Sequence, residues 1–268
     1  MNGVDVREIR HAAVVGSPIS HSLSPIVHRA AYQALDIDWS YEAIEQTKDS
    51  FPEFVHNRPA SWRGLSITMP LKEVALLISD SASDLAVSVG AANTLIHDGA
   101  TWHAENTDVG GIVTCFAERG VRTCNRATLL GGGATARSAF AALVAMGVDE
   151  VTLCVRRAES AAEFVEWAAQ WDVTVRVATM EPVAEFASAD VVISSVPHDA
   201  ADAWAVVAGE GALLDVSYHP WPTVLARSWR GSVSSGRDLL LWQAVEQVHL
   251  MTGLVAPIDA MRSALNSA

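Results

Sequence analysis

The sequence predicts an α/β protein built from two domains. Short runs rich in β-branched residues alternate with helical stretches in the N-terminal part of the chain and again in its middle. With 268 residues, half of them hydrophobic, the chain is long enough for two modest cores. Strands and helices that alternate in this way form sheets covered by the intervening helices. The tail from about Gly236 differs, because it is helical throughout.

Two helices in the N-terminal part have clear start signals. The helix candidates are Ser24–Leu35 and Pro70–Ser79, and the strand candidates are Ala12–Val15, Ser40–Ile44, Leu65–Thr68 and Asn93–Ile96. Pro25 and Pro70 are expected at the first helical position, where the fixed φ of proline fits and no donor is lost. Ser24 is expected to be an N-cap. The boundary between the domains is expected near Asp108–Gly110.

The middle of the chain predicts a parallel sheet. Its strand candidates are Ala127–Leu130, Val151–Val155, Val173–Val177, Val191–Ser195 and Ala212–Val216. Helix candidates Thr135–Met146 and Ala161–Trp171 lie between them. Nearly continuous apolar strands separated by helices are typical of a parallel sheet with both faces covered. In the tail, Leu239–Met251 and Pro257–Leu265 are expected to be helices, and their spacing does not say which domain they pack on.

Composition excludes several classes of function. The net charge of −13 and the lack of a basic stripe argue against nucleic-acid binding. No apolar run approaches the roughly 20 residues that span a bilayer, and the polar segment Met1–Arg10 does not resemble a secretory signal. Cys115, Cys124 and Cys154 are an odd number without CxxC spacing, which indicates reduced core thiols in a cytoplasmic protein. None of the nine histidines has metal-ligand spacing, so we expect no metal.

A glycine-rich segment ends one strand and opens the next helix. Gly131, Gly133 and Ala136 fit the pattern G-x-G-x-x-A. Glycine lets the backbone approach a pyrophosphate, and the helix N-terminus supplies N–H groups and a positive dipole end. The alternative is a purely structural turn. The candidate cofactor-binding residues here are Gly131, Gly132, Gly133, Ala134, Thr135 and Ala136.

Two arginines follow the next strand, where NAD-binding domains usually carry an acidic residue for the ribose 2′-hydroxyl. Arg156 and Arg157 instead offer two guanidiniums that suit a 2′-phosphate, which favours NADP. The alternative is a solvated basic loop. Glu159 lies close in the sequence and leaves NAD open.

Polar groups gather at strand ends of the first domain. Ser22 and Ser24 could hold a carboxylate near a helix N-terminus, or act only as caps. Lys72 stands in the first turn of a helix, where a cation is electrostatically unfavourable; this local conflict suggests function, although a solvated lysine is the alternative. Asn93 and Asp108 offer amide and carboxylate groups for a hydroxylated ligand, and Asp108 could equally be the N-cap of a helix from Val109.

Seven segments together resemble the motifs of the shikimate dehydrogenase family. In order they are Gly16–Pro25 with His28, Ser66–Lys72, Gly90–Thr94, Asn106–Asp108 with Gly111, Gly131–Arg137, Asp215–Tyr218 with Pro220 and Thr223, and Gly236–Ala244. The resemblance implies two α/β domains around a cleft. Residues 1–108 would bind substrate, residues 109–236 would form a Rossmann-like NADP-binding domain, and helices in residues 237–268 would return to the first domain. It also implies NADP-dependent, reversible reduction of 3-dehydroshikimate to shikimate in aromatic amino-acid biosynthesis, by a cytoplasmic monomer or homodimer.

The resemblance implies a role for each matching residue. Ser22 and Ser24 would hold the substrate carboxylate. The ring hydroxyls would be bound by Thr68, Asn93, Asp108 and Gln243. Lys72 and Asp108 would serve proton transfer, and the sequence leaves open whether Lys72 acts alone. Tyr218 would lie near the nicotinamide and substrate, and further cofactor candidates are Ser195, Val196 and Gly236.

The chain departs from the family motifs at three places. Ser66 and Ile67 replace the usual Asn and Val, for which we expect a modest effect on a loop. In the glycine loop, Gly132 and Ala134 stand where Ala and Gly are common, and the Cβ of Ala134 could shift cofactor binding. The usual Asn-Arg-Thr after the second Rossmann strand is replaced by Val155-Arg156-Arg157, which keeps the arginine character.

Three other functions compete with this interpretation. An NAD-preferring quinate or quinate/shikimate dehydrogenase would carry an acidic residue in place of Arg156 and Arg157. A catalytically silent NADP-binding regulator would lack Lys72 or Asp108. A one-carbon or glutamyl-tRNA reductase-like relative would not carry the serines at Ser22 and Ser24.

Overall fold

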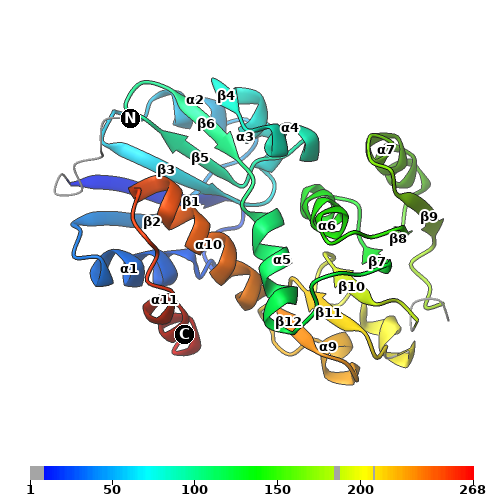
Figure 1. Ribbon diagram of the computed structural model, residues 1–268. Helices are drawn as coiled ribbons and strands as arrows, with labels where there is room; N and C mark the ends of the chain where they lie inside the picture. The colour runs from blue at the N-terminus through cyan, green and yellow to red at the C-terminus, as the bar shows by residue number, and fades with distance from the viewer. Residues whose placement is uncertain (1–8, 184–187, 208) are drawn as a thin grey trace. The chain divides into compact units, whose positions relative to one another are not determined.

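The computed structural model describes residues 9–183, 188–207 and 209–268. The chain divides into two compact units, Met1–Thr107 together with Leu240–Ala268, and Asp108–Leu239. The division therefore falls once at the start of helix α5 (Asp108–Glu118) and once within helix α10 (Gly236–Thr252) (Figure 1).

The first unit contains a mixed sheet in the order β2-β1-β3-β5-β6-β4. Its strands are β1 (Arg10–Gly16), β2 (Trp39–Glu45), β3 (Trp62–Ile67), β4 (Ser81–Ala82), β5 (Thr94–His97) and β6 (Trp102–Glu105). Strand β1 runs parallel to β2 and β3, whereas β5 runs antiparallel to β3 and β6. As a result, the carboxyl ends of β1, β3 and β6 and the amino end of β5 meet at one edge of the sheet.

Helices cover both faces of this sheet. They are α1 (Ser24–Ala34), α2 (Phe51–His56), α3 (Lys72–Ile78), α4 (Asp84–Val89), the part of α10 from Leu240, and α11 (Ile258–Asn266). Successive residues of β1 point to opposite faces. Ala12 and Val14 pack in a core with α1, α10 and α11, and Ala13 and Val15 pack in a second core with α2 and α3. The C-terminal helices thus pack on the first unit, which confirms the expectation from the resemblance.

Two expected helix starts in this unit are wrong. Helix α3 begins at Lys72 after Leu71, so Pro70 lies in the preceding turn and is not the first helical residue. The Leu71 N–H donates to the Thr68 carbonyl at 2.9 Å, which closes that turn before the helix begins. Ser24 is already the first residue of α1 and therefore not its N-cap, a position occupied by Leu23 without a side-chain cap.

The second unit contains six parallel strands in the order β12-β11-β10-β7-β8-β9. The strands are β7 (Arg126–Leu130), β8 (Glu150–Cys154), β9 (Thr174–Ala178), β10 (Val191–Ser194), β11 (Ala212–Asp215) and β12 (Val233–Ser235). This is the doubly wound Rossmann order, in which ligands bind outside the carboxyl ends of the strands where the order reverses. Here that switch point lies between β7 and β10. The predicted α/β fold class is confirmed.

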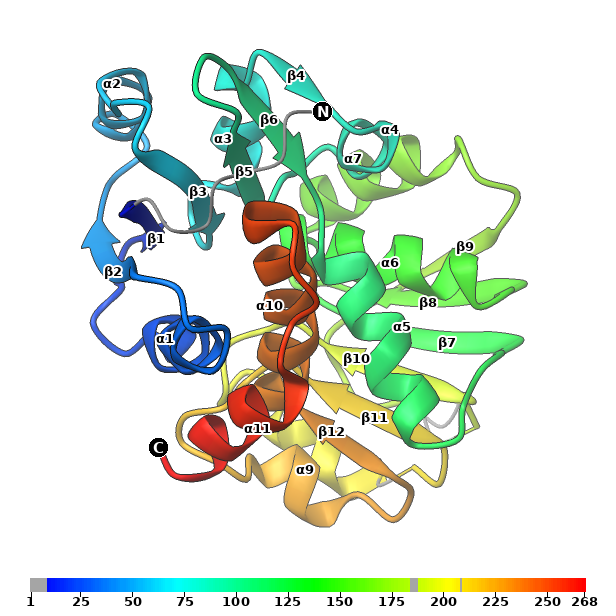
Figure 2. The same cartoon turned by 60° about the vertical axis from the view of Figure 1, so that its left-hand side comes forward.

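Within its described residues, the second unit also contains helices α5, α6 (Ala134–Ala145), α7 (Ala158–Ala168), the 3₁₀ helix η1 (Asp202–Val207) and α9 (Val224–Ser228). Helices α5 and α6 pack side by side (Figure 2). All three cysteines of the chain lie in this unit and are free and buried, as predicted. Burial raises the pKa of the Cys124 and Cys154 thiols to about 12, so neither is a ready nucleophile. No helix in the described ranges is long and apolar enough to cross a membrane.

Candidate active site

Polar side chains of the first unit gather at the sheet edge where β1, β3 and β6 end and β5 begins. Ser22 lies in the loop after β1, and Ser24 begins the helix that follows it; Thr68 lies in the loop after β3, and Lys72 begins the next helix. Main-chain hydrogen bonds hold these segments together. The Thr68 N–H donates to the Val15 carbonyl at 2.9 Å, and the Ala92 N–H donates to the Lys72 carbonyl at 2.9 Å. This edge therefore unites residues from three separate predicted motifs.

Gly16, the last residue of β1, permits the loops after β1 and β3 to approach each other. A Cβ at this position would lie 2.7 Å from the Met69 carbonyl oxygen and would collide with the Thr68 side chain. The neighbouring Ser17 N–H donates to the same Met69 carbonyl at 3.0 Å. Any side chain at position 16 would therefore push the loop with Thr68 away from the serine loop.

Asn93 has a fixed orientation at this edge and is only 2% exposed. Its Nδ2 donates to Thr107 Oγ1 at 2.9 Å and to Gln243 Oε1 at 3.3 Å. Its Oδ1 accepts from the Thr107 backbone N–H at 2.7 Å. The structure thus brings together Asn93 and Gln243, which the sequence assigns to one ligand although 150 positions separate them.

The serine loop is tied to a buried tyrosine. The Ser24 N–H donates to Ser22 Oγ at 3.3 Å, and Ser24 is buried at the start of α1. Tyr41 on β2 hydrogen-bonds the side chains of Ser66 and Ser24. Burial raises the pKa of the Tyr41 phenol, and these hydrogen bonds offset only part of that rise. The phenol is therefore a neutral partner for Ser24.

Lys72 and Asp108, the two residues assigned to proton transfer, begin helices in different units. Lys72 is the first residue of α3 and is half-buried. Asp108 is the first residue of α5 and is 5% exposed. Along the chain Asp108 directly follows Thr107, which is hydrogen-bonded to Asn93.

In the second unit, Gly131 lies at the switch point between β7 and β10. It has φ of +108°, a conformation that favours glycine. A Cβ there would lie 2.6 Å from Ser195 Oγ and 3.2 Å from Val196 Cγ1. Ser195 is itself fixed, because its N–H and its hydroxyl both donate to the Leu130 carbonyl at 2.9 Å. The structure therefore brings together three residues that were predicted for one site, Gly131, Ser195 and Val196.

The glycine loop fits a dinucleotide phosphate. Gly133 is the N-cap residue of α6 and offers no side-chain cap, and a Cβ added to it would meet nothing within 4 Å. By contrast, a Cβ on Gly132 would lie 3.2 Å from Val155 Cγ1. Open space at a helix N-terminus with backbone N–H groups is the arrangement that binds a pyrophosphate. Ala134 follows as the first residue of the helix.

The arginine pair follows β8, the strand next to β7. Arg156 and Arg157 are both exposed, and Arg157 occupies the N-cap position of α7. Glu159 lies in the first turn of that helix. Both guanidiniums thus belong to the carboxyl edge of the same sheet as the glycine loop.

A buried acid at the end of β11 fixes the loop that carries Tyr218. Asp215 is 2% exposed, and it accepts from Thr223 Oγ1 at 2.7 Å and from the Ser217 N–H at 3.1 Å. Burial raises the pKa of Asp215 more than these hydrogen bonds lower it, and burial also raises the pKa of Tyr218. The Gly236 N–H donates to the Ser217 carbonyl at 3.1 Å, and a side chain at Gly236 would collide with the Val216 carbonyl. Gly236 therefore lies against the Tyr218 loop.

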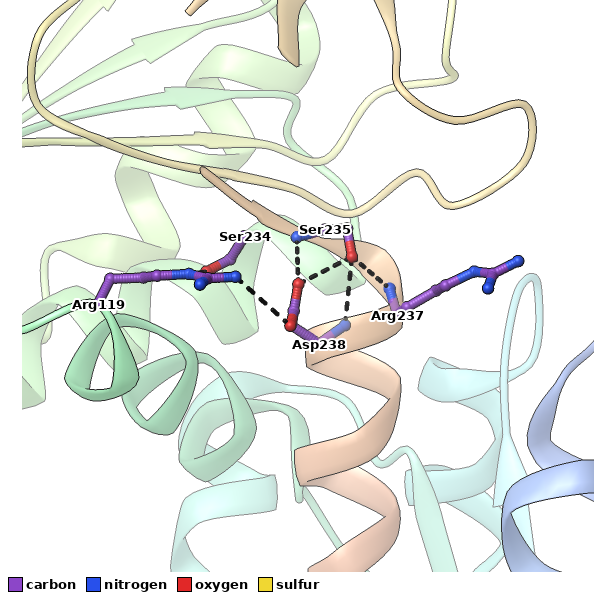
Figure 3. A network of polar contacts seen from close by, with 5 residues as sticks. All are labelled: Arg119, Ser234, Ser235, Arg237 and Asp238. Atoms are coloured by element: carbon purple, nitrogen blue, oxygen red, sulfur yellow. Dashed lines mark hydrogen bonds and ion pairs between the residues drawn. The ribbon is translucent and has the colours of Figure 1, made fainter. Parts of the chain in front are cut away.

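A capping box fixes the start of α10 (Figure 3). Ser235 Oγ accepts from the backbone N–H groups of Arg237 at 3.2 Å and Asp238 at 3.4 Å, and Asp238 Oδ2 accepts from the Ser235 N–H at 2.7 Å. Arg119, beyond the end of α5, reaches Ser234 Oγ at 3.3 Å and Asp238 Oδ1 at 3.7 Å. This arrangement was not predicted, although the Ser-x-x-Asp spacing before an apolar helix could have indicated it.

The described ranges contain no group of three or more His, Cys, Asp or Glu side chains that could hold a metal ion.

Comparisons with known proteins identify the family. The model of the shikimate dehydrogenase substrate-binding domain matches residues 14–95, and that of the shikimate 5′-dehydrogenase C-terminal domain matches residues 236–265. Shikimate dehydrogenase (NADP(+)) of Desulfitobacterium hafniense is 30% identical, over 97% of this chain and 98% of the relative. The chain belongs to the shikimate dehydrogenase family. The resemblance found in the sequence motifs is thereby confirmed.

Solved structures of the shikimate dehydrogenase family share the whole fold. The structure of Mycobacterium tuberculosis shikimate dehydrogenase is 37% identical with a TM-score of 0.89, and the match covers 97% of this chain and all (100%) of that one. A shikimate 5-dehydrogenase of Thermus thermophilus, solved in complex with NADP(H) and shikimate, is 26% identical with a TM-score of 0.84, covering 96% of this chain and 99% of that one. The family fold therefore extends over nearly the whole chain.

The residues that the shikimate dehydrogenase motifs assign are distributed between the two units. Those in the first unit are Ser22, Ser24, Thr68, Lys72, Asn93 and Gln243. Those in the second unit are Asp108, Gly131, Gly132, Gly133, Ala134, Thr135, Ala136, Arg156, Arg157, Ser195, Val196, Tyr218 and Gly236. One residue that the sequence analysis missed is Gln247, which is wholly buried behind Asn93.

Proposed function

We propose that this chain catalyses the reversible, NADP-dependent reduction of 3-dehydroshikimate to shikimate. One observation carries the proposal: a chain of the shikimate dehydrogenase family keeps Ser24, Thr68, Lys72, Asn93 and Gln243 at a single sheet edge. The relative from Thermus thermophilus, solved with NADP(H) and shikimate, supports the choice of substrate and cofactor.

The first unit supplies the substrate-binding domain, which corresponds to residues 1–108 with the helices of residues 237–268. Ser22 and Ser24 hold the substrate carboxylate: the Ser22 hydroxyl donates to it, and Ser24, whose hydroxyl is bonded to Tyr41, positions the Ser22 side chain through its N–H. A neutral donor suits an acidic protein, because its long-range attraction for an anion is weak. Thr68, Asn93 and Gln243 bind the ring hydroxyls. The Asn93 amide cannot rotate without losing buried hydrogen bonds, so a ligand that leaves it unpaired is rejected.

Lys72 and Asp108 serve the proton transfer. When bound, the reduced nicotinamide supplies the hydride to the ketone carbon. The ammonium of Lys72 donates a proton to the oxygen that becomes the hydroxyl, and it stabilises negative charge on that oxygen in the transition state. We assign to Asp108 a hydrogen bond to a substrate hydroxyl and a share in the same proton transfer.

The second unit, corresponding to residues 109–236, supplies the NADP-binding domain. Gly131 to Ala136 hold the pyrophosphate through backbone N–H groups at the start of α6. Arg156 and Arg157 hold the 2′-phosphate by charge-assisted hydrogen bonds. Ser195, Val196 and Gly236 would also hold the cofactor, and Tyr218 would lie near the nicotinamide and the substrate.

Steady-state absorbance of the nicotinamide tests this function with purified protein. Shikimate and quinate are each supplied with NADP and with NAD. Turnover confined to shikimate and NADP is the expected result. Preference for quinate or for NAD would overturn the assignment in favour of the quinate-using relatives. Binding of NADP without turnover in any combination would overturn the catalytic role altogether.

A further inference from the structure

Gln247 on α10 has every hydrogen-bonding position of its side-chain amide in use. Its Nε2 donates to Thr94 Oγ1 at 2.9 Å and to the Asn93 carbonyl at 3.2 Å. Its Oε1 accepts from Ser66 Oγ at 2.7 Å and lies 3.2 Å from His28 Nε2. The orientation of the amide is fixed, because the Asn93 carbonyl can only accept and so must face Nε2.

On one side, Gln247 determines the direction of the hydrogen bonds that reach Asn93. Because Thr94 Oγ1 accepts from Gln247, its own proton remains for Asn93 Oδ1, 3.0 Å away. The oxygen of the Asn93 amide is thereby kept on the Thr94 side, and its Nδ2 is presented toward Gln243. The Thr107 N–H holds the same oxygen at 2.7 Å. Gln247, one helical turn from Gln243, therefore reinforces through Thr94 the orientation of the amide that Gln243 contacts.

On the other side, Gln247 is linked to the serine loop. Ser66 donates its proton to Gln247, so its oxygen accepts from the Tyr41 phenol, which in turn hydrogen-bonds Ser24. His28 fixes the same tyrosine, since the two rings stack with centroids 4.0 Å apart and planes 8° apart. All of Ser66, Tyr41, His28 and Gln247 are buried, so none of these links competes with solvent.

We propose that Gln247 is a positioning residue for the reaction: it orients Asn93 through Thr94 and Ser24 through Ser66 and Tyr41. The inference rests on the proposed function, because Asn93 and Ser24 are its substrate-binding residues. Gln247 is wholly buried and acts only through its neighbours. Its predicted effect is therefore on substrate binding, and the NADP site in the second unit is unaffected.

The test replaces Gln247 by methionine, which has a similar length but cannot hold the four hydrogen bonds. The expected result is a KM for shikimate raised about tenfold or more, with the KM for NADP unchanged. Thr252→Val is the matched control, because Thr252 is buried on the same helix and, within the described residues, its hydroxyl hydrogen-bonds the backbone of Val248 and Leu254. It should lower the melting temperature and leave both KM values unchanged.

Thr94→Val tests the link to Asn93 while Gln247 itself is kept, with the loss of one hydrogen-bond acceptor of Gln247 Nε2. It should also raise the KM for shikimate, and in the double variant the two effects should be less than additive, because both remove one shared link. A lower melting temperature with an unchanged KM for shikimate in Gln247→Met and Thr94→Val would overturn the inference. Additive effects would overturn the link through Thr94. If Gln247→Met does not fold, Thr94→Val alone decides.

The unsubstituted protein distinguishes the two levels of failure. Turnover of shikimate by this protein, with an unchanged KM in the variants, would overturn only the role of Gln247. Absence of shikimate turnover in the unsubstituted protein would overturn the proposed function and this inference together.

Discussion

The carboxyl edges of the two sheets carry different kinds of chemistry. At the edge of the first sheet, Asn93, Thr94 and Gln247 are almost wholly buried, and each is held by side-chain hydrogen bonds. At the edge of the second sheet, the main features are the glycines from Gly131 to Gly133 and the exposed pair Arg156 and Arg157. The first edge is built from oriented side chains, and the second from backbone groups and exposed charged side chains.

This difference follows from the ligands proposed for each edge. A neutral ring hydroxyl offers one donor and weak acceptors, so recognition needs directional partners that cannot rotate. A phosphate carries charge on several oxygens, so N–H groups at a helix start and flexible guanidiniums suffice. Substitutions at the first edge should therefore change catalysis and substrate selection, whereas those at the second should change cofactor binding.

The largest effect is expected from Lys72→Ala at the first edge. Loss of the proton donor should lower kcat by about 10²- to 10⁴-fold with a smaller change in the KM for shikimate, because the group acts mainly in the transition state. Steady-state absorbance at saturating NADP measures both constants. Lys48→Ala is the control, since Lys48 is exposed and is the only other lysine of the chain. Near-normal kcat in the Lys72 variant would remove this residue from the mechanism.

The next largest effect is expected on the KM for NADP, from substitutions at the second edge. The double variant Arg156→Ala/Arg157→Ala should raise the KM for NADP about 10- to 100-fold and change the KM for NAD much less, because charge-assisted hydrogen bonds to the 2′-phosphate are lost. Arg122→Ala is a suitable control, because Arg122 is also exposed but precedes β7 at the opposite edge. Equal changes for NADP and NAD would show that the pair does not bind the 2′-phosphate.

Much of the fold could be predicted because its long strands are runs of buried apolar residues. All four residues of β10 are buried, and its sequence alone indicated a strand. Strands β4, β6 and β12 were missed: β4 and β12 contain only two and three residues, and β6 has the sequence Trp-His-Ala-Glu, in which polar residues alternate with buried ones. Such short strands are specified by pairing with neighbours, as between Val233 and Leu213, and not by a local pattern.

The candidate site was predictable to a different degree at the two edges. The glycine loop is visible in the sequence because Gly131 needs a positive φ and room beside Ser195. The burial and role of Gln247 could not be predicted from the sequence, because a glutamine on a helix normally faces solvent. Only its spacing of four from Gln243 places both on one helix face. Ser66 was expected to affect a loop, but it lies within β3 and in the buried network. The roles assigned to Lys72 and Asp108 remain predictions.

Smaller effects, on stability and on NADP binding, are expected when two glycines of the same loop are replaced. Gly131→Ala should destabilise the fold by about 1–3 kcal/mol, because it strains a positive φ and crowds Ser195. Gly133→Ala should leave the melting temperature unchanged, since its Cβ meets no protein atom within 4 Å, and should weaken NADP binding instead. Thermal unfolding and titration with NADP measure the two quantities. A lower melting temperature of the Gly133 variant would show that this glycine is needed for the fold, and would contradict the prediction that it is needed only for the backbone to approach the cofactor.

The smallest effect is expected on the pH dependence of the free energy of unfolding, through His28 in the buried network of the first edge. Burial lowers the pKa of His28 from 6.5 to about 3, only partly opposed by the hydrogen bond to Gln247. Between pH 6.5 and about 3, His28 is therefore protonated in the unfolded chain but neutral in the folded protein. The free energy of unfolding has its full value above pH 6.5 and decreases as the pH falls toward 3. Between pH 6.5 and 5.5 this amounts to about 1 kcal/mol.

His28→Phe should keep the ring stacked on Tyr41 but remove the titration. Denaturant unfolding at several pH values should then show a shallower loss of stability below pH 6.5 than in the unsubstituted protein, even if the variant is less stable at pH 7. His56→Gln, at an exposed histidine, should leave the slope unchanged. An equal slope in the His28 variant would mean that His28 is protonated in the folded protein. Such a result would contradict the presence of a neutral, buried His28 between Gln247 and Tyr41.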